Sequence, residues 1–152
     1  YGIQLREKQK LRRMFGLTEK QFHNTFNAAE KSNKSTGEHF LELLESRLDN
    51  IIFRLGFTQS RPEARQIVCH GHVMVDGKKV DIPSFRVKTN SIVAISPKFV
   101  DNTQVQKNLE LNSTLPEWLE RKATVGKVLR MPTRDEMEQV VNGRLIVEFY
   151  SR

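Results

Sequence analysis

The sequence predicts an α+β fold, and three observations support this class. Helical periodicity fills the start of the chain, two short helical segments follow it, and an Asp-Gly turn between alternating strands comes directly after them. The strand patterns beyond this turn are not separated by long helices, as they would be in a parallel sheet. With 152 residues, the chain is too short for a solenoid array or a large multidomain enzyme.

The first part of the chain predicts three helices. Residues 4–15 form a helical pattern that ends at Gly16, and Thr18 with Gln21 provides a capping box for the next helix. A polar loop at 31–37 separates this second helix from a third. The expected core residues of the second and third helices are Phe22, Phe26, Ala29, Phe40, Leu41, Leu43 and Leu44.

A change of pattern predicts a domain boundary at Glu45 or Ser46. Ser46 has the features of a new N-cap, and the short helix that it begins stops at Gly56. Ser60 starts another helix, which ends at Gly71. The sequence thus predicts two short helices joined by a turn.

The strongest local signal is the two-residue turn Asp76-Gly77, which lies between the alternating segments 72–75 and 78–81 and predicts a type I′ hairpin. Two further strands are expected at 82–88 and 91–96. The sequence therefore predicts a small α+β module in which the helix pair, the hairpin and the further strands build a mainly antiparallel sheet with its helices.

The net charge of +7 and the isoelectric point near 9.8 make a polyanion the leading candidate partner. Residues 1–20, 47–88 and 121–130 each carry four more basic than acidic side chains, which predicts discrete basic faces. Arg61 and Arg65 are four residues apart on one helix, where like charges repel unless an anion neutralises them. A phosphate backbone would neutralise both.

Disulfide, metal-binding and enzymatic interpretations of the sequence have less support than polyanion binding. One cysteine, Cys69, permits no internal disulfide, so we expect a reducing compartment. His70 and His72 lack nearby ligands at metal-binding spacing, and Trp118 between leucines is typical of a core residue. No nucleophile elbow, phosphate loop or membrane-spanning run is present, so we expect no enzyme activity, no cofactor, no metal and no membrane partner.

An ordered set of short motifs lies between residues 47 and 84. It comprises Arg47-Leu48-Asp49, Arg54-Leu55-Gly56, Ser60-Arg61, Ala64-Arg65-Gln66, His70-Gly71-His72-Val73, Val75-Asp76-Gly77 and Val80-Asp81-Ile82-Pro83-Ser84. These motifs resemble the RNA-binding module of the S-four family of small-subunit ribosomal proteins, which some pseudouridine synthases and tyrosyl-tRNA synthetases share. The resemblance continues outside the module in Gln9-Lys10-Leu11-Arg12, Pro116-Glu117-Trp118-Leu119, Arg130-Met131-Pro132-Thr133-Arg134 and the segment 145–152.

Three departures from the family pattern are visible. The chain starts at Tyr1 without the basic first segment of the family, which we expect to be missing and which holds a zinc site in some bacterial members. Pro62 and Cys69 replace what are often Arg and Asn, and Gly143 lies inside the last helical region.

The resemblance implies a discontinuous helical domain, residues 1–45 completed by 125–152, with the RNA-binding domain inserted at 46–124. It implies a ribosome-bound, cytoplasmic structural protein that binds small-subunit (16S-type) ribosomal RNA at a multi-helix junction of the five-prime domain. Nucleation of 30S assembly, a contribution to translational accuracy, contact with the S-five protein and binding of its own operon messenger RNA are further implications.

The residues that we expect to bind RNA are basic or lie in the module motifs. They are Lys8, Lys10, Arg12, Arg13, Arg47, Arg54, Arg61, Arg65, His70, His72, Lys78, Lys79 and Arg86. The alternative function is a stand-alone RNA- or DNA-binding regulator, because two short helices joined by a turn resemble a helix-turn-helix. A pseudouridine synthase would need a further catalytic domain, for which the chain is too short.

Overall fold

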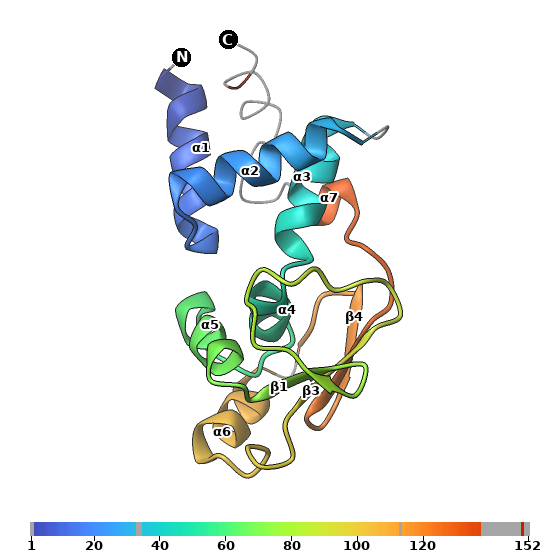
Figure 1. The fold of residues 1–152 in the computed structure, drawn as a ribbon. Coiled ribbons are helices and arrows are strands. Elements are labelled where there is room, and N and C mark those ends of the chain that lie inside the picture. The colour runs from blue at the N-terminus through green and yellow to red at the C-terminus, as the bar shows by residue number, and fades with distance from the viewer. Residues whose placement is uncertain (1, 33–34, 113, 138–149, 151–152) are drawn as a thin grey trace. The chain divides into compact units, whose positions relative to one another are not determined.

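A computed structural model describes residues 2–32, 35–112, 114–137 and 150 (Figure 1). The chain divides into two compact units: a helical unit, Tyr1–Glu45 with Pro132–Arg152, and a sheet unit, Ser46–Met131. The protein is of the α+β class. No helix among the described residues is long and apolar enough to cross a membrane.

The described part of the helical unit contains α1 (Gly2–Phe15), α2 (Glu19–Glu30), α3 (Thr36–Glu45) and the short α7 (Arg134–Met137). The expected capping box is confirmed, since the Thr18 hydroxyl accepts from the Gln21 N–H and the Gln21 side chain accepts from the Thr18 N–H. The expected aromatic stripe is buried as well. Phe22 and Phe40 are fully buried and meet edge to face, with ring centroids 5.0 Å apart.

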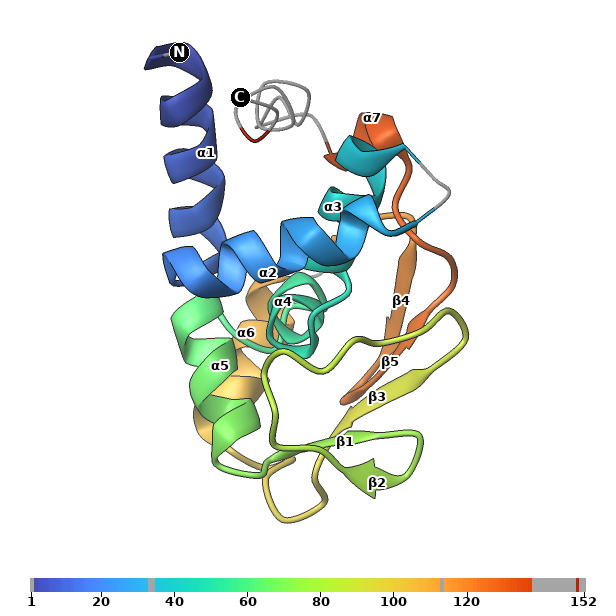
Figure 2. The same cartoon turned by 45° about the horizontal axis from the view of Figure 1, so that its top comes forward.

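The sheet unit contains α4 (Leu48–Arg54), α5 (Arg61–Cys69), α6 (Thr103–Leu111) and five strands. The strands are β1 (Val73–Val75), β2 (Lys78–Lys79), β3 (Ile92–Ile95), β4 (Leu119–Lys122) and β5 (Val125–Val128), in the antiparallel order β2-β1-β3-β5-β4. Within this unit, the helices lie beside the sheet and enclose one apolar core with it (Figure 2). Trp118, which is 2% exposed, belongs to this core, as expected.

The predicted hairpin is confirmed. Val75 pairs with Lys78 across the turn, and both turn residues have positive φ, 50° at Asp76 and 82° at Gly77, as a type I′ turn requires. The Asp76 carboxylate also accepts a hydrogen bond of 2.9 Å from the Ile92 N–H, which ties the turn to β3. The hairpin therefore has a fixed position in the sheet unit.

The structure differs from the sequence prediction at two helix and strand assignments. Ser46 does not cap α4, because the N-cap residue is Arg47 and no side chain makes the capping bond. Residues 82–88 form no strand; Arg86 makes an isolated bridge to Arg47, and the Val87 N–H donates to the Ser46 carbonyl. This segment contains Pro83, whose ring removes one backbone donor from any strand.

The second domain boundary also lies elsewhere than we expected. Residues 125–131 were expected in the helical domain, but β5 is hydrogen-bonded between β3 and β4 and its Val128 is buried in the core of the sheet unit. The boundary therefore falls between Met131 and Pro132. Gly143 and most of the expected C-terminal segment lie outside the described residues.

Candidate nucleic-acid interface

The charge of Lys8 is paired inside the helical unit. Its side chain is 10% exposed, its Nζ donates to Glu19 Oε2 at 2.7 Å, and the Nζ also lies 5.6 Å from the centroid of the Tyr150 ring. The hydrogen bond from Lys8 is the main reason why the pKa of Glu19 is lowered. The pKa of Tyr150 is raised to about 12, mainly because its hydroxyl is desolvated by burial and also because the charge of Glu19 lies nearby. Lys8 thus connects α1 with Glu19 at the start of α2, and its expected contact with RNA stays a prediction.

The guanidinium of Arg12 is also engaged in contacts inside the helical unit. It donates to Gln9 Oε1 at 2.8 Å and to the Leu17 carbonyl at 2.9 Å, and it lies 3.1 Å from Glu19 Oε1. These contacts fix the turn between α1 and α2. Of the four cations expected on α1, Lys10 and Arg13 are the exposed ones.

Arg47 is a core residue of the sheet unit and is 6% exposed. Its guanidinium makes two hydrogen bonds to the Asp49 carboxylate, at 3.2 and 3.1 Å, and Asp49 is itself 2% exposed. A buried charge pair of this kind is satisfied internally, and Arg47 stands at the N-cap of α4. The structure therefore gives Arg47 a role in the fold, while its contact with RNA stays a prediction.

Two arginines share one aromatic ring on the sheet unit. The guanidinium carbon of Arg61 lies 4.6 Å from the Phe53 ring centroid, and that of Arg54 lies 5.9 Å from it. Arg61 Nε also donates to Oδ1 of the fully buried Asn50 at 2.9 Å. We call Phe53, Arg54, Arg61 and Arg65 the arginine cluster, since Arg65 follows Arg61 by four residues on α5 and is likewise partly exposed.

The hairpin supplies further exposed charge. Lys78 and Lys79 are exposed in β2, and the Lys79 side chain passes over Gly71 in the space that a Cβ would fill. Gly71 has a φ of 78°, so both its backbone and its lack of a side chain suit this position. Arg86 is exposed beyond the hairpin.

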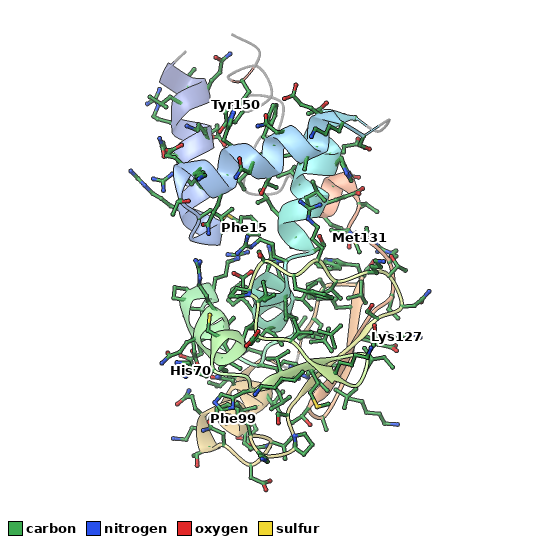
Figure 3. The ribbon with its side chains drawn as sticks, viewed as in Figure 1. Phe15, His70, Phe99, Lys127, Met131 and Tyr150 are labelled. Carbon is green, nitrogen blue, oxygen red and sulfur yellow. The ribbon has the colours of Figure 1, made fainter. Side chains whose placement is uncertain are left out.

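The two histidines lie where α5 ends and β1 begins, and His70 is labelled in Figure 3. His70 is exposed, whereas the His72 ring stacks on Phe99 with centroids 3.9 Å apart and an interplanar angle of 7°. Among the described residues, no group of three His, Cys, Asp or Glu side chains could hold a metal ion.

Arg121 lies in the basic segment 121–130, but its guanidinium is bound to backbone carbonyls inside the sheet unit. Its guanidinium donates to the Leu55 carbonyl at 2.6 Å and to the Leu109 carbonyl at 3.3 Å. These bonds provide donors for backbone carbonyls at the C-terminal ends of α4 and α6. Burial lowers the pKa of Arg121. No local sequence signal marks this role, because its partners are 66 and 12 residues away.

The comparisons with known proteins agree with this division of the molecule. The family profile described as "S4 domain" matches residues 46–93, and the profile described as "Ribosomal protein S4/S9 N-terminal domain" matches residues 1–45. The class is thus a ribosomal protein that carries an S4 domain.

Full-length similarity specifies the family. The chain is 48% identical over 154 aligned residues to the small ribosomal subunit protein uS4 of Thermoanaerobacter sp. strain X514, covering 100% of this chain and 75% of that protein. It is 48% identical to the uS4 protein of Listeria monocytogenes serotype 4b strain CLIP80459, of which it covers 77%. The chain belongs to the uS4 family of small ribosomal subunit proteins, whose members are structural, ribosome-bound and not enzymes.

Proposed function

We propose that this protein binds small-subunit (16S-type) ribosomal RNA directly, at a multi-helix junction of the five-prime domain. The arginine cluster is the observation that supports this most. A guanidinium supported by an aromatic ring and by a buried amide is oriented before a ligand arrives, so it loses little side-chain entropy when it meets a phosphate.

The proposed interface differs from the set expected from sequence. It omits the buried Lys8 and Arg47 and the partly exposed Arg12, whose guanidinium is engaged with Glu19, Gln9 and the Leu17 carbonyl. The proposed residues form two groups: Arg54, Arg61, Arg65, Lys78, Lys79 and Arg86 on the sheet unit, and Lys10 and Arg13 on the helical unit. Most of these side chains would contact phosphates, which position a protein on folded RNA without reading its sequence.

Binding at a junction offers a physical route to the other proposed roles. A protein with basic residues on two units can neutralise phosphates of several RNA helices that would otherwise repel one another. Holding the helices together early would nucleate 30S assembly, and through the assembled subunit it would contribute to translational accuracy. Contact with neighbouring small-subunit proteins, the S-five protein among them, and binding of its own operon messenger RNA belong to the same proposal.

The test is a binding measurement with an RNA fragment of the five-prime domain. We expect Arg61→Ala with Arg65→Ala to weaken binding at least tenfold, because a charged contact of this kind contributes about 1–3 kcal/mol. The matched control is Lys98→Ala with Lys107→Ala, which removes the same charge from exposed positions of the sheet unit.

An effect of less than about threefold is expected for the control pair. Equal losses from both pairs would contradict a localised interface, and equal retention on duplex DNA at the same salt concentration would favour the alternative of a DNA-binding regulator. Melting curves of both variants check that the loss is not unfolding.

A further inference from the structure

A hollow of about 260 Å³ lies on the sheet unit between the end of α5 and the start of α6. The rings of His70, His72 and Phe99 line it, and His70 and Phe99 are labelled in Figure 3. Polar and aliphatic side chains complete its walls: Glu63, Gln66, Ile67, Asn102, Gln104 and Val105.

The aromatic wall is a layered stack. Phe99 packs against the core of the sheet unit, and the His72 ring lies parallel to it at 3.9 Å. The His70 ring stands edge-on to His72, with centroids 6.2 Å apart and an interplanar angle of 78°. His72 is partly exposed, and it lines the hollow together with Phe99 and His70.

The lining argues against an anion as the occupant. It contains no lysine or arginine, and it includes the carboxylate of Glu63, which repels phosphate. Glu63 is held in place, because Oε2 accepts from the Gln59 N–H at 3.2 Å and Oε1 accepts from Asn108 Nδ2 at 3.4 Å. A flat, uncharged ring with polar edges suits this lining better: it can stack on His72 and bond to imidazole or amide groups.

We propose that this hollow takes one unpaired nucleobase of the bound RNA. The inference rests on the proposed RNA-binding function and adds to it a site for a base. Unpaired bases that stack on aromatic side chains are a general mode of RNA recognition. A hollow of about 260 Å³ offers room for one such ring.

The helix geometry connects this hollow with the arginine cluster. At 3.6 residues per turn, Glu63, Gln66 and His70 follow one side of α5, while Arg61 and Arg65 follow the opposite side. The exposed residues Pro62 and Cys69 form the ridge between the two sides. The proposed path of the RNA crosses this ridge, with phosphates at the arginine cluster and an extruded base at His72.

Two RNA hairpins with the same stem test the proposal, one fully paired and one with a single-nucleotide bulge. We expect the unmodified protein to bind the bulged hairpin at least about fivefold more tightly, which is the lower end of the effect of stacking a base on an aromatic ring. His72→Ala should abolish this preference and leave the affinity for the paired hairpin unchanged. His72→Phe should keep the preference, because it retains a flat ring.

The control is Phe85→Ala, which removes an aromatic side chain that is 39% exposed and lies outside the hollow. The preference for the bulge should survive this change. Equal affinity of the unmodified protein for both hairpins, or a preference that His72→Ala leaves intact, would overturn the base site without affecting the proposed function. Failure to bind the five-prime-domain fragment would overturn the proposed function and the base site with it, whereas failure to bind either hairpin while the fragment is bound would overturn the base site alone.

Discussion

At the scale of single residues, some cationic side chains of this protein are bonded inside the fold and others are exposed on its surface. Lys8, Arg12, Arg47 and Arg121 all lie in basic stretches of sequence, yet each is hydrogen-bonded to a carboxylate or carbonyl inside its own unit. Charge patterning locates basic segments, but it does not tell which side chain turns inward. That choice depends on partners such as Glu19 and Asp49.

The contact between Lys8 and Glu19 predicts a pH dependence of stability. The pKa of Glu19 is lowered in the folded protein, mainly by Lys8, so the pair stabilises the fold above the ordinary pKa of a glutamate. This contribution is lost as the pH falls through the lowered pKa. We expect Glu19→Gln to cost about 0.2–1 kcal/mol at neutral pH, the range of exposed ion pairs, and to cost less in acid.

Denaturant unfolding of both proteins at neutral and acidic pH measures this difference. A difference that stays constant down to strongly acidic pH would show that the charge of Glu19 is not what stabilises the helical unit.

The buried pair of Arg47 and Asp49 predicts a larger effect. Asp49→Ala leaves the Arg47 guanidinium buried without its carboxylate, so we expect a loss of about 3–5 kcal/mol in the free energy of unfolding. The measurement is equilibrium unfolding in urea. A loss below about 1 kcal/mol would indicate that Arg47 reaches solvent, which would return it to the set of possible RNA contacts.

At the scale of elements, two glycines show two different reasons why a position requires glycine: the backbone conformation and the lack of space for a side chain. Gly77 has a φ of 82° and open space where a Cβ would lie, so only its backbone conformation requires glycine. Gly126 in β5 has no positive φ, but a Cβ there would lie 2.5 Å from Cδ1 of Leu55, the residue that caps the C-terminus of α4. Gly77 thus sets the hairpin, whereas Gly126 allows α4 to approach the sheet.

These two glycines predict substitution costs of different origin. Gly77→Ala should destabilise the protein by about 1–2 kcal/mol through left-handed backbone strain. Gly126→Ala should cost about 1–3 kcal/mol through overcrowding of the core. Combining Gly126→Ala with Leu55→Ala should recover the steric part of the loss, whereas combining Gly77→Ala with Leu55→Ala should simply add the two costs.

Thermal unfolding of the two single and two double variants, together with Leu55→Ala alone, checks this. Additive behaviour in both combinations would contradict the contact between Gly126 and Leu55.

The elements that could be predicted from sequence have local determinants. The capping box of Thr18 and the turn at Asp76-Gly77 act within a few residues, and both are present. In contrast, β4 contains three charged residues in four positions and β5 contains a glycine, so neither shows a strand pattern. These strands form because they pair with each other and with β3, which is a long-range condition.

The α6 helix was missed although its start has a local signal. The Asn102 side chain accepts from the Gln104 and Val105 N–H groups, as N-cap residues do.

At the scale of the whole molecule, the protein consists of two units that carry separate basic groups. Motif order predicted the family and the boundary region near residue 46, but it could not show that Lys8 and Arg47 are buried. Nor could it bring His72 and Phe99 together, since 27 residues separate them in sequence and only the fold makes them adjacent. Family resemblance thus supplied the type of function, and packing decides which side chains can perform it.

The central claim is that a localised basic interface binds ribosomal RNA by neutralising phosphates. The most direct measurement is the salt dependence of affinity for the five-prime-domain fragment. If about six phosphates are neutralised, the slope of log K against log salt concentration should be about −4 to −5. Arg61→Ala with Arg65→Ala should reduce its magnitude by about 1.5, whereas Lys98→Ala with Lys107→Ala should leave it unchanged. A slope near zero, or the same reduction in both variants, would contradict the claim.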